Sequence, residues 1–200
     1  MTKFLTLKHW QLFLILIGFP MILQFIAIGL AVGSRGYPWN GFIILFPIVM
    51  FLYTGLFFIW FYSLGTNLFK RLPVLPVTEK MSLTKFKTFL FIAAAYIMIF
   101  CVFIFGMLAN LSAGGQPNPM IFALIIPLHL FCMFCIFYCL YFNAKALKTV
   151  ELQKPVTFSD FAGEFFLLWF FPIGIWIVQP RINRLFNTSP GHSGDDLFTA

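Results

Sequence analysis

Charged residues are scarce in this chain, and acidic residues are the scarcest. Only 10% of the 200 residues are charged, and six of them are Asp or Glu. A soluble domain would carry roughly 25% charged residues. Because 61% of the chain is hydrophobic, the composition excludes an ordinary soluble domain and predicts a membrane protein.

Four long stretches contain no Asp, Glu, Lys or Arg at all. Each has 22 to 24 residues, and about 20 residues suffice for a helix to cross the hydrocarbon core. The stretches are continuously apolar rather than alternating, which excludes a β-barrel. We therefore expect transmembrane helices at about 11–32, 41–64, 88–110 and 120–142.

The absence of carboxylates from these stretches also narrows the function. Ion-coupled transporters and proton pumps usually keep Asp or Glu on their pathway. Here His129 is the only histidine within a stretch, and histidine is the side-chain type suited to proton transfer near neutral pH, so proton-coupled transport is disfavoured. No P-loop, nucleophile elbow or zinc-protease motif occurs either. We expect no enzymatic activity and no cofactor.

Cysteine is also rare, and all four Cys lie within apolar stretches, so disulfides of the secreted type are not expected. Cys132, Cys135 and Cys139 follow His129 along one helical stripe. Soft ligands on one face suggest copper or zinc, with His129, Cys132 and Cys101 as the weak candidates. One stripe cannot surround an ion, and Cys is a common small residue at helix contacts, so we expect no metal.

The basic residues that are present lie almost entirely on one side of the predicted zigzag. Twelve of the thirteen Lys and Arg are on the side shared by both termini, and only Arg35 lies in one of the other two loops. This asymmetry predicts cytoplasmic N- and C-termini, with a bacterial inner (plasma) membrane as the expected location. The charges form no compact patch, so we expect no nucleic acid. The same belt would attract anionic lipids on the cytoplasmic face.

The segments outside the helices are short. The first stretch is too long for a signal-peptide core of about 7–15 residues, so we expect it to be retained. The outer loops, about 33–40 and 111–119, are rich in Gly, Pro and Asn, which suits tight turns and disfavours a receptor for large external ligands. In the longer link at 65–87, Ser82 or Thr84 is a candidate cap for the third helix.

A fifth apolar segment, Phe165–Val178, is shorter than the others and contains Pro172 and Gly174. Fourteen helical residues reach about 21 Å, which is less than the core of about 30 Å. A crossing would also move Arg181 and Arg184 to the outside. Pro172 would break a helix by removing a backbone N–H and clashing with the preceding turn. We expect the segment to re-enter from the cytoplasm or to lie along the interface, packed against the four helices.

The predicted fold is therefore an all-α integral membrane protein. Four transmembrane helices form two antiparallel hairpins, and the Pro/Gly-broken re-entrant or interfacial hydrophobic segment follows them. Residues 1–155 form the four-helix domain, residues 156–186 form the re-entrant or interfacial region, and residues 187–200 form a disordered tail.

Polar residues inside the stretches fall near a common depth. Gln24 and His129 lie about 12–14 Å from the outer ends of their helices, and Tyr53 and Thr54 lie near the same level. Polar groups in lipid usually face the bundle interior and find partners. We therefore predict an intramembrane polar cluster of these four residues. It is either a pocket or, as we favour, ordinary hydrogen bonding between helices.

The fifth segment and the residues after it form a candidate contact for lipid or a cytoplasmic partner. Its residues are Trp169, Pro172, Gly174, Trp176, Gln179, Arg181 and Arg184. Anchoring to lipid phosphates is favoured over docking to a protein. Asp160 and Glu164 could pair with Arg181 or Arg184, or cap the segment through Thr157 or Ser159.

Three functions remain open at this point. The favoured one is a non-enzymatic accessory or scaffold subunit of a membrane complex, or a homo-oligomer. The second is an oligomeric channel, pore or membrane-perturbing effector, for which the polar level is the motivation. The third is a lipid-directed membrane enzyme, which would need a site at Asp160, Glu164, Gln179 and Arg181.

Overall fold

A computed structural model describes residues 3–33, 39–73, 81–116 and 119–187, and every regular element within these ranges is helical. The elements are α1 (Lys3–Thr6), α2 (His9–Phe13), the π-helical η1 (Leu14–Gly18), α3 (Phe19–Gly33), α4 (Trp39–Phe69), α5 (Leu83–Ser112), α6 (Pro119–Leu152), α7 (Phe158–Trp169) and α8 (Phe171–Asn187). Four spans within the described residues are long and apolar enough to cross a membrane: α2 to α3 as one unit, α4, α5 and α6. The predicted class, an all-α multi-pass membrane protein, is confirmed.

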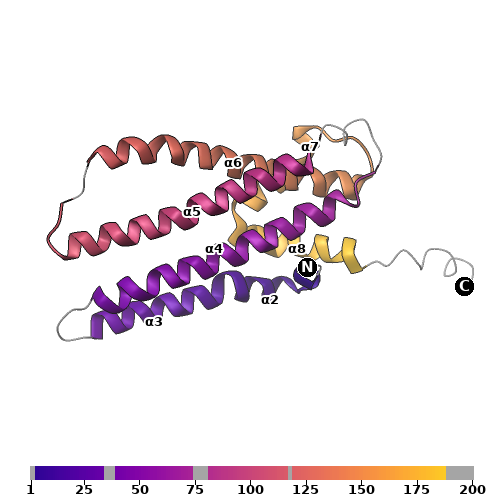
Figure 1. Ribbon diagram of the computed structural model, residues 1–200. Helices are drawn as coiled ribbons and strands as arrows, with labels where there is room; N and C mark the ends of the chain where they lie inside the picture. The colour runs from indigo at the N-terminus through magenta and orange to yellow at the C-terminus, as the bar shows by residue number, and fades with distance from the viewer. Residues whose placement is uncertain (1–2, 34–38, 74–80, 117–118, 188–200) are drawn as a thin grey trace, which may run out of the picture.

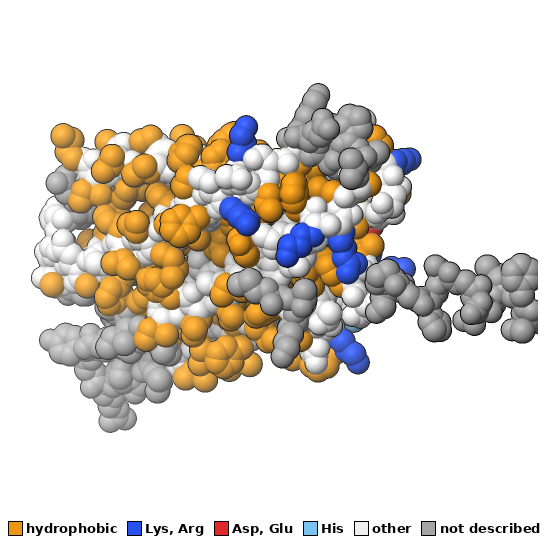
Figure 2. Space-filling model, turned by 45° about the vertical axis from the view of Figure 1, so that its right-hand side comes forward, with side chains coloured by type: hydrophobic (Ala, Val, Ile, Leu, Met, Phe, Trp, Pro, Cys, Tyr) orange, Lys and Arg blue, Asp and Glu red, His pale blue; other side chains and the backbone are white. Residues whose placement is uncertain are grey.

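The long helices pair as two antiparallel hairpins (Figure 1). α3 packs against α4, α5 packs against α6, and α4 joins the pairs by contacting both α5 and α6. α7, α8 and the N-terminus gather at one end. Lys and Arg side chains also collect toward this end (Figure 2). We call it the basic end, and we call the opposite end, where α3 and α5 finish, the loop end.

The helices extend beyond the uncharged stretches at the basic end. α4 continues to Phe69, α5 begins at Leu83, and α6 continues to Leu152. Ser82 caps α5 by accepting a hydrogen bond from the Lys85 backbone N–H at 3.3 Å. The extensions are amphipathic rather than uniformly apolar, so charge counting ends α4 and α6 too early and begins α5 too late.

Proline affects only one of the three long apolar runs that contain it. α4 and α6 run through Pro47 and Pro127 without interruption. Pro20 instead follows the π-helical turn η1, in which the Phe19 N–H bonds to the Leu14 carbonyl. Pro20 cannot donate to the carbonyl four residues before it, and a widened turn is one way to relieve the clash of its ring.

The packed core lies at the basic end. Its largest fully buried side chains come from segments spread along the chain: Leu5, Leu12, Leu16, Trp60, Leu64, Leu68, Phe86, Leu147, Phe161, Leu168, Ile175 and Ile182. Gly65 permits a close helix approach there. A Cβ at this position would lie 2.4 Å from the Phe86 ring and 2.6 Å from Asn143 Oδ1.

The fifth apolar segment forms two helices rather than one. The chain turns at Phe170, between α7 and α8. The break therefore lies two residues before Pro172, the residue at which the sequence predicts it. Pro172 lies in the first turn of α8, where no intrahelical donor is required of it. Gly174 is needed at the turn because a Cβ there would lie 1.7 Å from the Leu167 carbonyl oxygen. The predicted tail, 187–200, lies outside the described residues after Asn187.

Candidate functional site

An ion-pair network links α6, α7 and α8 at the basic end. Arg181 donates from Nε to Glu151 Oε1 at 2.7 Å and from its terminal nitrogen to Glu164 Oε1 at 2.6 Å, with a second contact to Glu151. Lys148 Nζ lies 3.1 Å from Glu164 Oε1. Two cations therefore face two carboxylates, and the network is neutral. The pairing of Arg181 with Glu164, expected from the sequence, is confirmed.

The protonation equilibria follow from these contacts. The hydrogen bond to Glu151 raises the pKa of Arg181, although burial opposes this, and the bond to Glu164 adds to it. Burial raises the pKa of Glu164. Hydrogen bonds from Arg181, the backbone and Lys148 outweigh burial and hold the pKa below its usual value. Both shifts favour the charged forms of Arg181 and Glu164.

Asp160 has a local role at the start of α7. Its carboxylate accepts from the Thr157 backbone N–H at 2.7 Å and from the Thr157 hydroxyl at 2.8 Å. These bonds lower the pKa of Asp160. This is the capping arrangement expected through Thr157, and it is confirmed.

Gln179 and Asn183 hold the N-terminal segment on α8. Gln179 is fully buried, and its Nε2 lies 3.0–3.3 Å from the carbonyl oxygens of Phe4, Leu5 and Leu7. Asn183 donates to the same Leu7 carbonyl at 3.0 Å. The amide Oε1 of Gln179 is buried without a partner among the described residues. α1 thus depends on side chains about 170 residues away for its carbonyl partners.

The four residues that the lipid-directed enzyme hypothesis requires at one site are engaged within the chain. Asp160 caps α7, Gln179 holds α1, and Glu164 and Arg181 pair with each other. Their contacts account for the joining of helices at the basic end.

The predicted lipid or partner contact residues divide between two faces. Gly174 is buried at the α7–α8 turn, and Trp169, Pro172 and Trp176 are exposed. Trp176 packs against the rings of His9 and Phe13. Arg184 and Arg181 line a polar cavity of about 280 Å³ with Glu151 and Leu185. The exposed Trp and Pro lie at the turn, while both Arg lie nearer the end of α8.

The predicted intramembrane polar cluster is distributed over several surfaces. Thr54 is buried and lines a cavity together with Tyr53. His129 lies on an exposed face of α6, where its Nδ1 is 3.3 Å from the Tyr96 hydroxyl. Gln24 is half-buried on α3. α3 packs on α4, and α6 packs on α5 and α4.

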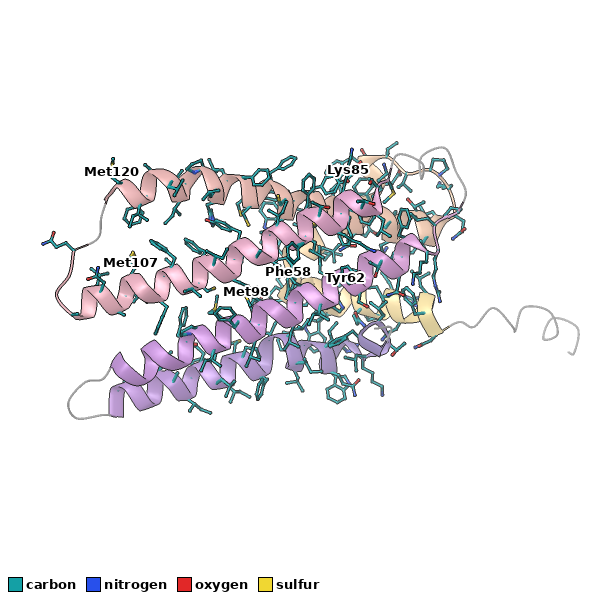
Figure 3. All side chains as sticks on the ribbon, viewed as in Figure 1. Phe58, Tyr62, Lys85, Met98, Met107 and Met120 are labelled. Atoms are coloured by element: carbon teal, nitrogen blue, oxygen red, sulfur yellow. The ribbon has the colours of Figure 1, made fainter. Side chains whose placement is uncertain are left out.

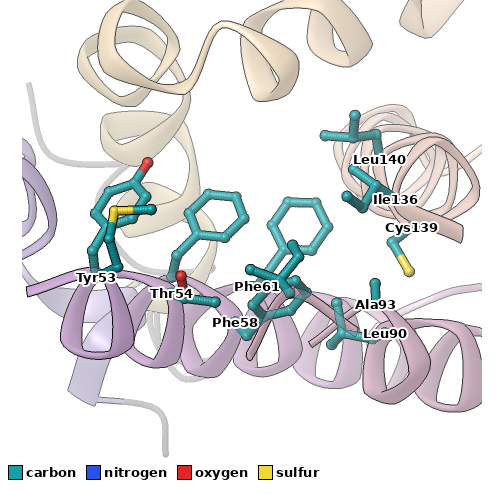
Figure 4. A pocket seen from close by; sticks show the side chains of 12 residues that line it. Tyr53, Thr54, Phe58, Phe61, Leu90, Ala93, Ile136, Cys139 and Leu140 are labelled. Atoms are coloured by element: carbon teal, nitrogen blue, oxygen red, sulfur yellow. The ribbon is translucent and has the colours of Figure 1, made fainter. Parts of the chain in front are cut away.

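The cavity lined by Tyr53 and Thr54 is an apolar space between the long helices (Figure 4). It has a volume of about 290 Å³ and lies between α4, α5 and α6. Phe58 and Phe61 of α4, Leu90 of α5, and Cys139 of α6 are on its wall. Such a lining suits an apolar chain rather than a hydrated ion.

The cysteine stripe faces α5. Cys132, Cys135 and Cys139 are buried, and the thiols of Cys132 and Cys139 lie 4.0 Å and 3.8 Å from backbone carbonyls of α5. Among the described residues, no three His, Cys, Asp or Glu are grouped as metal ligands. The stripe therefore acts as a helix-packing surface, and Cys101 is separate from it on α5.

The half of α6 nearest the loop end is covered by few residues of this chain. Of residues 120–131, all but Ile125 are exposed. In the 18-residue apolar stretch of α6, only 11% of the residues are buried, and the same fraction is buried in α5. The corresponding fraction for α4 is 39%. Figure 3 shows α5 and α6 diverging toward Met107 and Met120. An open apolar face with His129 on it results.

Sequence reasoning missed Glu151, Asn183, Tyr96 and Asn143. Counting residues from the outer helix ends could not place Tyr96 at the depth of His129. Such counting assumes that all helices end at the same level, whereas α5 reaches farther than α6 at the loop end (Figure 1). Asn143 is fully buried and donates to the Phe61 carbonyl at 3.4 Å, but it lies just past an apolar stretch, where a polar residue is ordinary. The helical spacing of apolar residues continues after Phe142. This pattern indicates that α6 extends as far as Glu151.

The chain matches no protein-family model, no curated protein and no solved structure.

Proposed function

We propose that this protein is a non-enzymatic assembly subunit of the membrane. It would associate laterally with further transmembrane helices, either a second copy or a partner protein, through the open face of α5 and α6. The basic end would act as the rigid base that holds the two hairpins together. The observation that carries the proposal is the exposure of His129 on a helix whose 18-residue apolar stretch is only 11% buried.

Lipid can cover apolar side chains, but it cannot satisfy a polar ring. His129 follows Met120 by nine residues, about 14 Å along the helix, which is near the middle of a core of about 30 Å. Tyr96 engages Nδ1, and no residue that the structure describes is paired with Nε2. Polar side chains at such depths usually face other helices. A neighbouring helix on this face would supply that partner.

We further propose that the basic end is cytoplasmic and that the α7–α8 turn enters the cytoplasmic leaflet. Trp169 packs on Phe137 of α6, with ring centroids 4.9 Å apart. Phe137 follows Met120 by 17 residues, about 26 Å, so the turn reaches a few ångströms into a core of about 30 Å. Exposed Trp169, Phe170 and Ile173 at the turn suit that position.

Crosslinking in native membranes tests the assembly proposal. A photoreactive amino acid at Leu130, which is 65% exposed on α6, should give a discrete crosslinked species. Its mass would distinguish a second copy from a partner. Phe25, which is 66% exposed on α3, is the matched control and should give none. Equal yields at both positions, with a monomeric particle in mild detergent, would refute the proposal.

His129→Leu provides a second test. Hydrogen bonds between membrane helices contribute about 0.6 kcal/mol on average, or roughly a threefold change in an association constant. We expect a loss of that order in the assembled fraction. No change would show that His129 does not contribute to the contact.

The exposed His129 also favours a second function, an oligomeric channel in which His129 lines a path between subunits. Purified protein in liposomes should then conduct ions, with flux altered by His129→Leu but not by Leu130→Ile. Absence of flux from assembled protein would exclude it.

A further inference from the structure

A groove runs along the outer surface of α4 and α5 at the basic end. Its volume is about 410 Å³, and Ile59, Leu90, Phe91 and Ala94 are among the apolar residues that line it. The same groove has Lys87 on its rim. The Lys87 ammonium lies over the Tyr62 ring, 5.8 Å from its centroid. Phe58 and Tyr62 point from α4 toward α5 (Figure 3).

The groove continues toward the interior of the bundle. Phe58 and Leu90 line both this groove and the enclosed cavity of about 290 Å³ between α4, α5 and α6. An apolar chain in the groove would therefore rest against the two side chains that separate it from the cavity. Inside a bilayer, the apolar chains that reach such a surface are lipid acyl chains.

Lys87 lies at the level of lipid headgroups. Its neighbour Phe86 stacks on Phe142 with ring centroids 4.5 Å apart. Phe142 follows Met120 by 22 residues, about 33 Å of helix, which is just beyond a core of about 30 Å. The ammonium thus lies beside lipid phosphates while Leu90 and Ala94 lie beside the acyl chains.

The charge near this rim is positive. All three carboxylates in the described part of the chain are engaged elsewhere: Glu151 and Glu164 in the ion-pair network, and Asp160 in the α7 cap. Lys87 is the charged residue on the groove's lining. An anionic headgroup complements this cation, whereas a zwitterionic headgroup brings a cation of its own.

We propose that the α4–α5 groove binds an anionic phospholipid, with the phosphate at Lys87 and an acyl chain between Leu90 and Phe58. This inference is independent of the assembly through α5 and α6, because it concerns the opposite end of the helices.

Native mass spectrometry of the detergent-purified full chain tests the site. Phosphatidylglycerol and phosphatidylcholine with identical acyl chains are added at equal concentration. We expect preferential retention of phosphatidylglycerol. Lys87→Gln should lower its retention about fivefold, the loss of roughly one basic residue near a charged surface. Lys154→Gln, at an exposed position in the α6–α7 turn, is the matched control and should change little.

A second variant tests the acyl-chain part of the groove. Ala94→Phe fills it and should reduce retention of phosphatidylglycerol, while Ala123→Phe on the exposed face of α6 should not. Equal retention of both lipids by the wild type would overturn the proposal. So would equal effects of Lys87→Gln and Lys154→Gln, or undiminished binding by Ala94→Phe.

Discussion

Gly174 illustrates how a single residue determines the α7–α8 turn. A Cβ on Gly174 would lie 1.7 Å from the Leu167 carbonyl oxygen, and no flexible side chain is there to move aside. We predict that Gly174→Ala lowers the free energy of unfolding by about 1–3 kcal/mol, the usual cost of overpacking. Gly163→Ala on α7, with nothing within 4 Å, should be neutral or stabilising by up to about 1 kcal/mol. Unfolding in detergent micelles measures both, and equal stabilities would contradict the turn geometry.

Arg181 is the residue on which the ion-pair network depends. Its removal would leave Glu151 and Glu164 side by side with only Lys148 to compensate. We predict that Arg181→Met costs about 2–3 kcal/mol at pH 7, somewhat less than breaking a fully buried pair because the side chains retain some exposure. Lys154→Met, at an exposed position, should have little effect. The measurement is the free energy of unfolding in micelles.

The stability lost in Arg181→Met should depend on pH. In the wild type the pKa of Glu164 is lowered on folding. Its contribution to stability is therefore present above the ordinary glutamate pKa and is lost as the pH falls through the lowered value. Without the guanidinium of Arg181, burial raises the pKa of Glu164, and protonation of this carboxylate then stabilises the variant. The deficit of Arg181→Met relative to the wild type should shrink between pH 7 and pH 4, and a constant deficit would contradict the network.

The pairing of Glu164 with Arg181 was predictable at the residue scale because both flank the same short apolar segment. The contact of Arg181 with Glu151 was not, since Glu151 lies on α6 and only the folding back of α7 and α8 brings Arg181 near it. Gln179 was predicted as a contact residue, but its buried role on α1 depends on packing between opposite ends of the chain.

At the scale of elements, α1 is too short to be stable alone and depends on α8. A four-residue helix cannot offset the cost of nucleation. Its Phe4 and Leu5 carbonyls accept from Gln179, and the Leu7 carbonyl just after it accepts from Asn183. We predict that Gln179→Leu accelerates amide hydrogen exchange over residues 4–8 by at least about tenfold, the loss of roughly one to two hydrogen bonds. Gln24→Leu on α3 is the control and should leave exchange there unchanged. Unaltered exchange in Gln179→Leu would show that apolar packing alone holds α1.

The effect of each proline on its helix is not predictable from the sequence. Pro20, Pro47 and Pro127 each lie within an apolar run, but only Pro20 follows a π-helical turn. Leu12, before this turn, and Leu16, within it, are fully buried at the basic end. Which proline distorts its helix depends on the packing required of neighbouring turns, and that is not local information.

At the scale of the whole molecule, orientation is the property that remains to be measured. We predict that a cysteine replacing Lys154 reacts with a membrane-impermeant maleimide only after the membrane is permeabilised. A cysteine replacing Gln116, near the loop end, should react in intact cells. Cys101, Cys132, Cys135 and Cys139 are replaced by Ser or Ala beforehand.

Arg184→Cys extends the same labelling to the end of α8. It should behave as Lys154→Cys does, because the α7–α8 hairpin returns to the side from which it starts. Labelling of Arg184→Cys in intact cells, with Lys154→Cys protected, would mean that the fifth segment crosses the membrane.

The sequence by itself determined the class, the number of long apolar helices and their pairing as hairpins. The reason is that the bilayer imposes length and charge rules that can be read along a single chain. Only the tertiary structure decided which apolar surfaces are buried. Leu, Phe and Ile suit both a helix contact and lipid, so the packed basic end and the open halves of α5 and α6 look alike in sequence. The tertiary structure also decided where the scarce polar groups meet, because Glu151, Arg181, Gln179 and Tyr96 find partners on other helices.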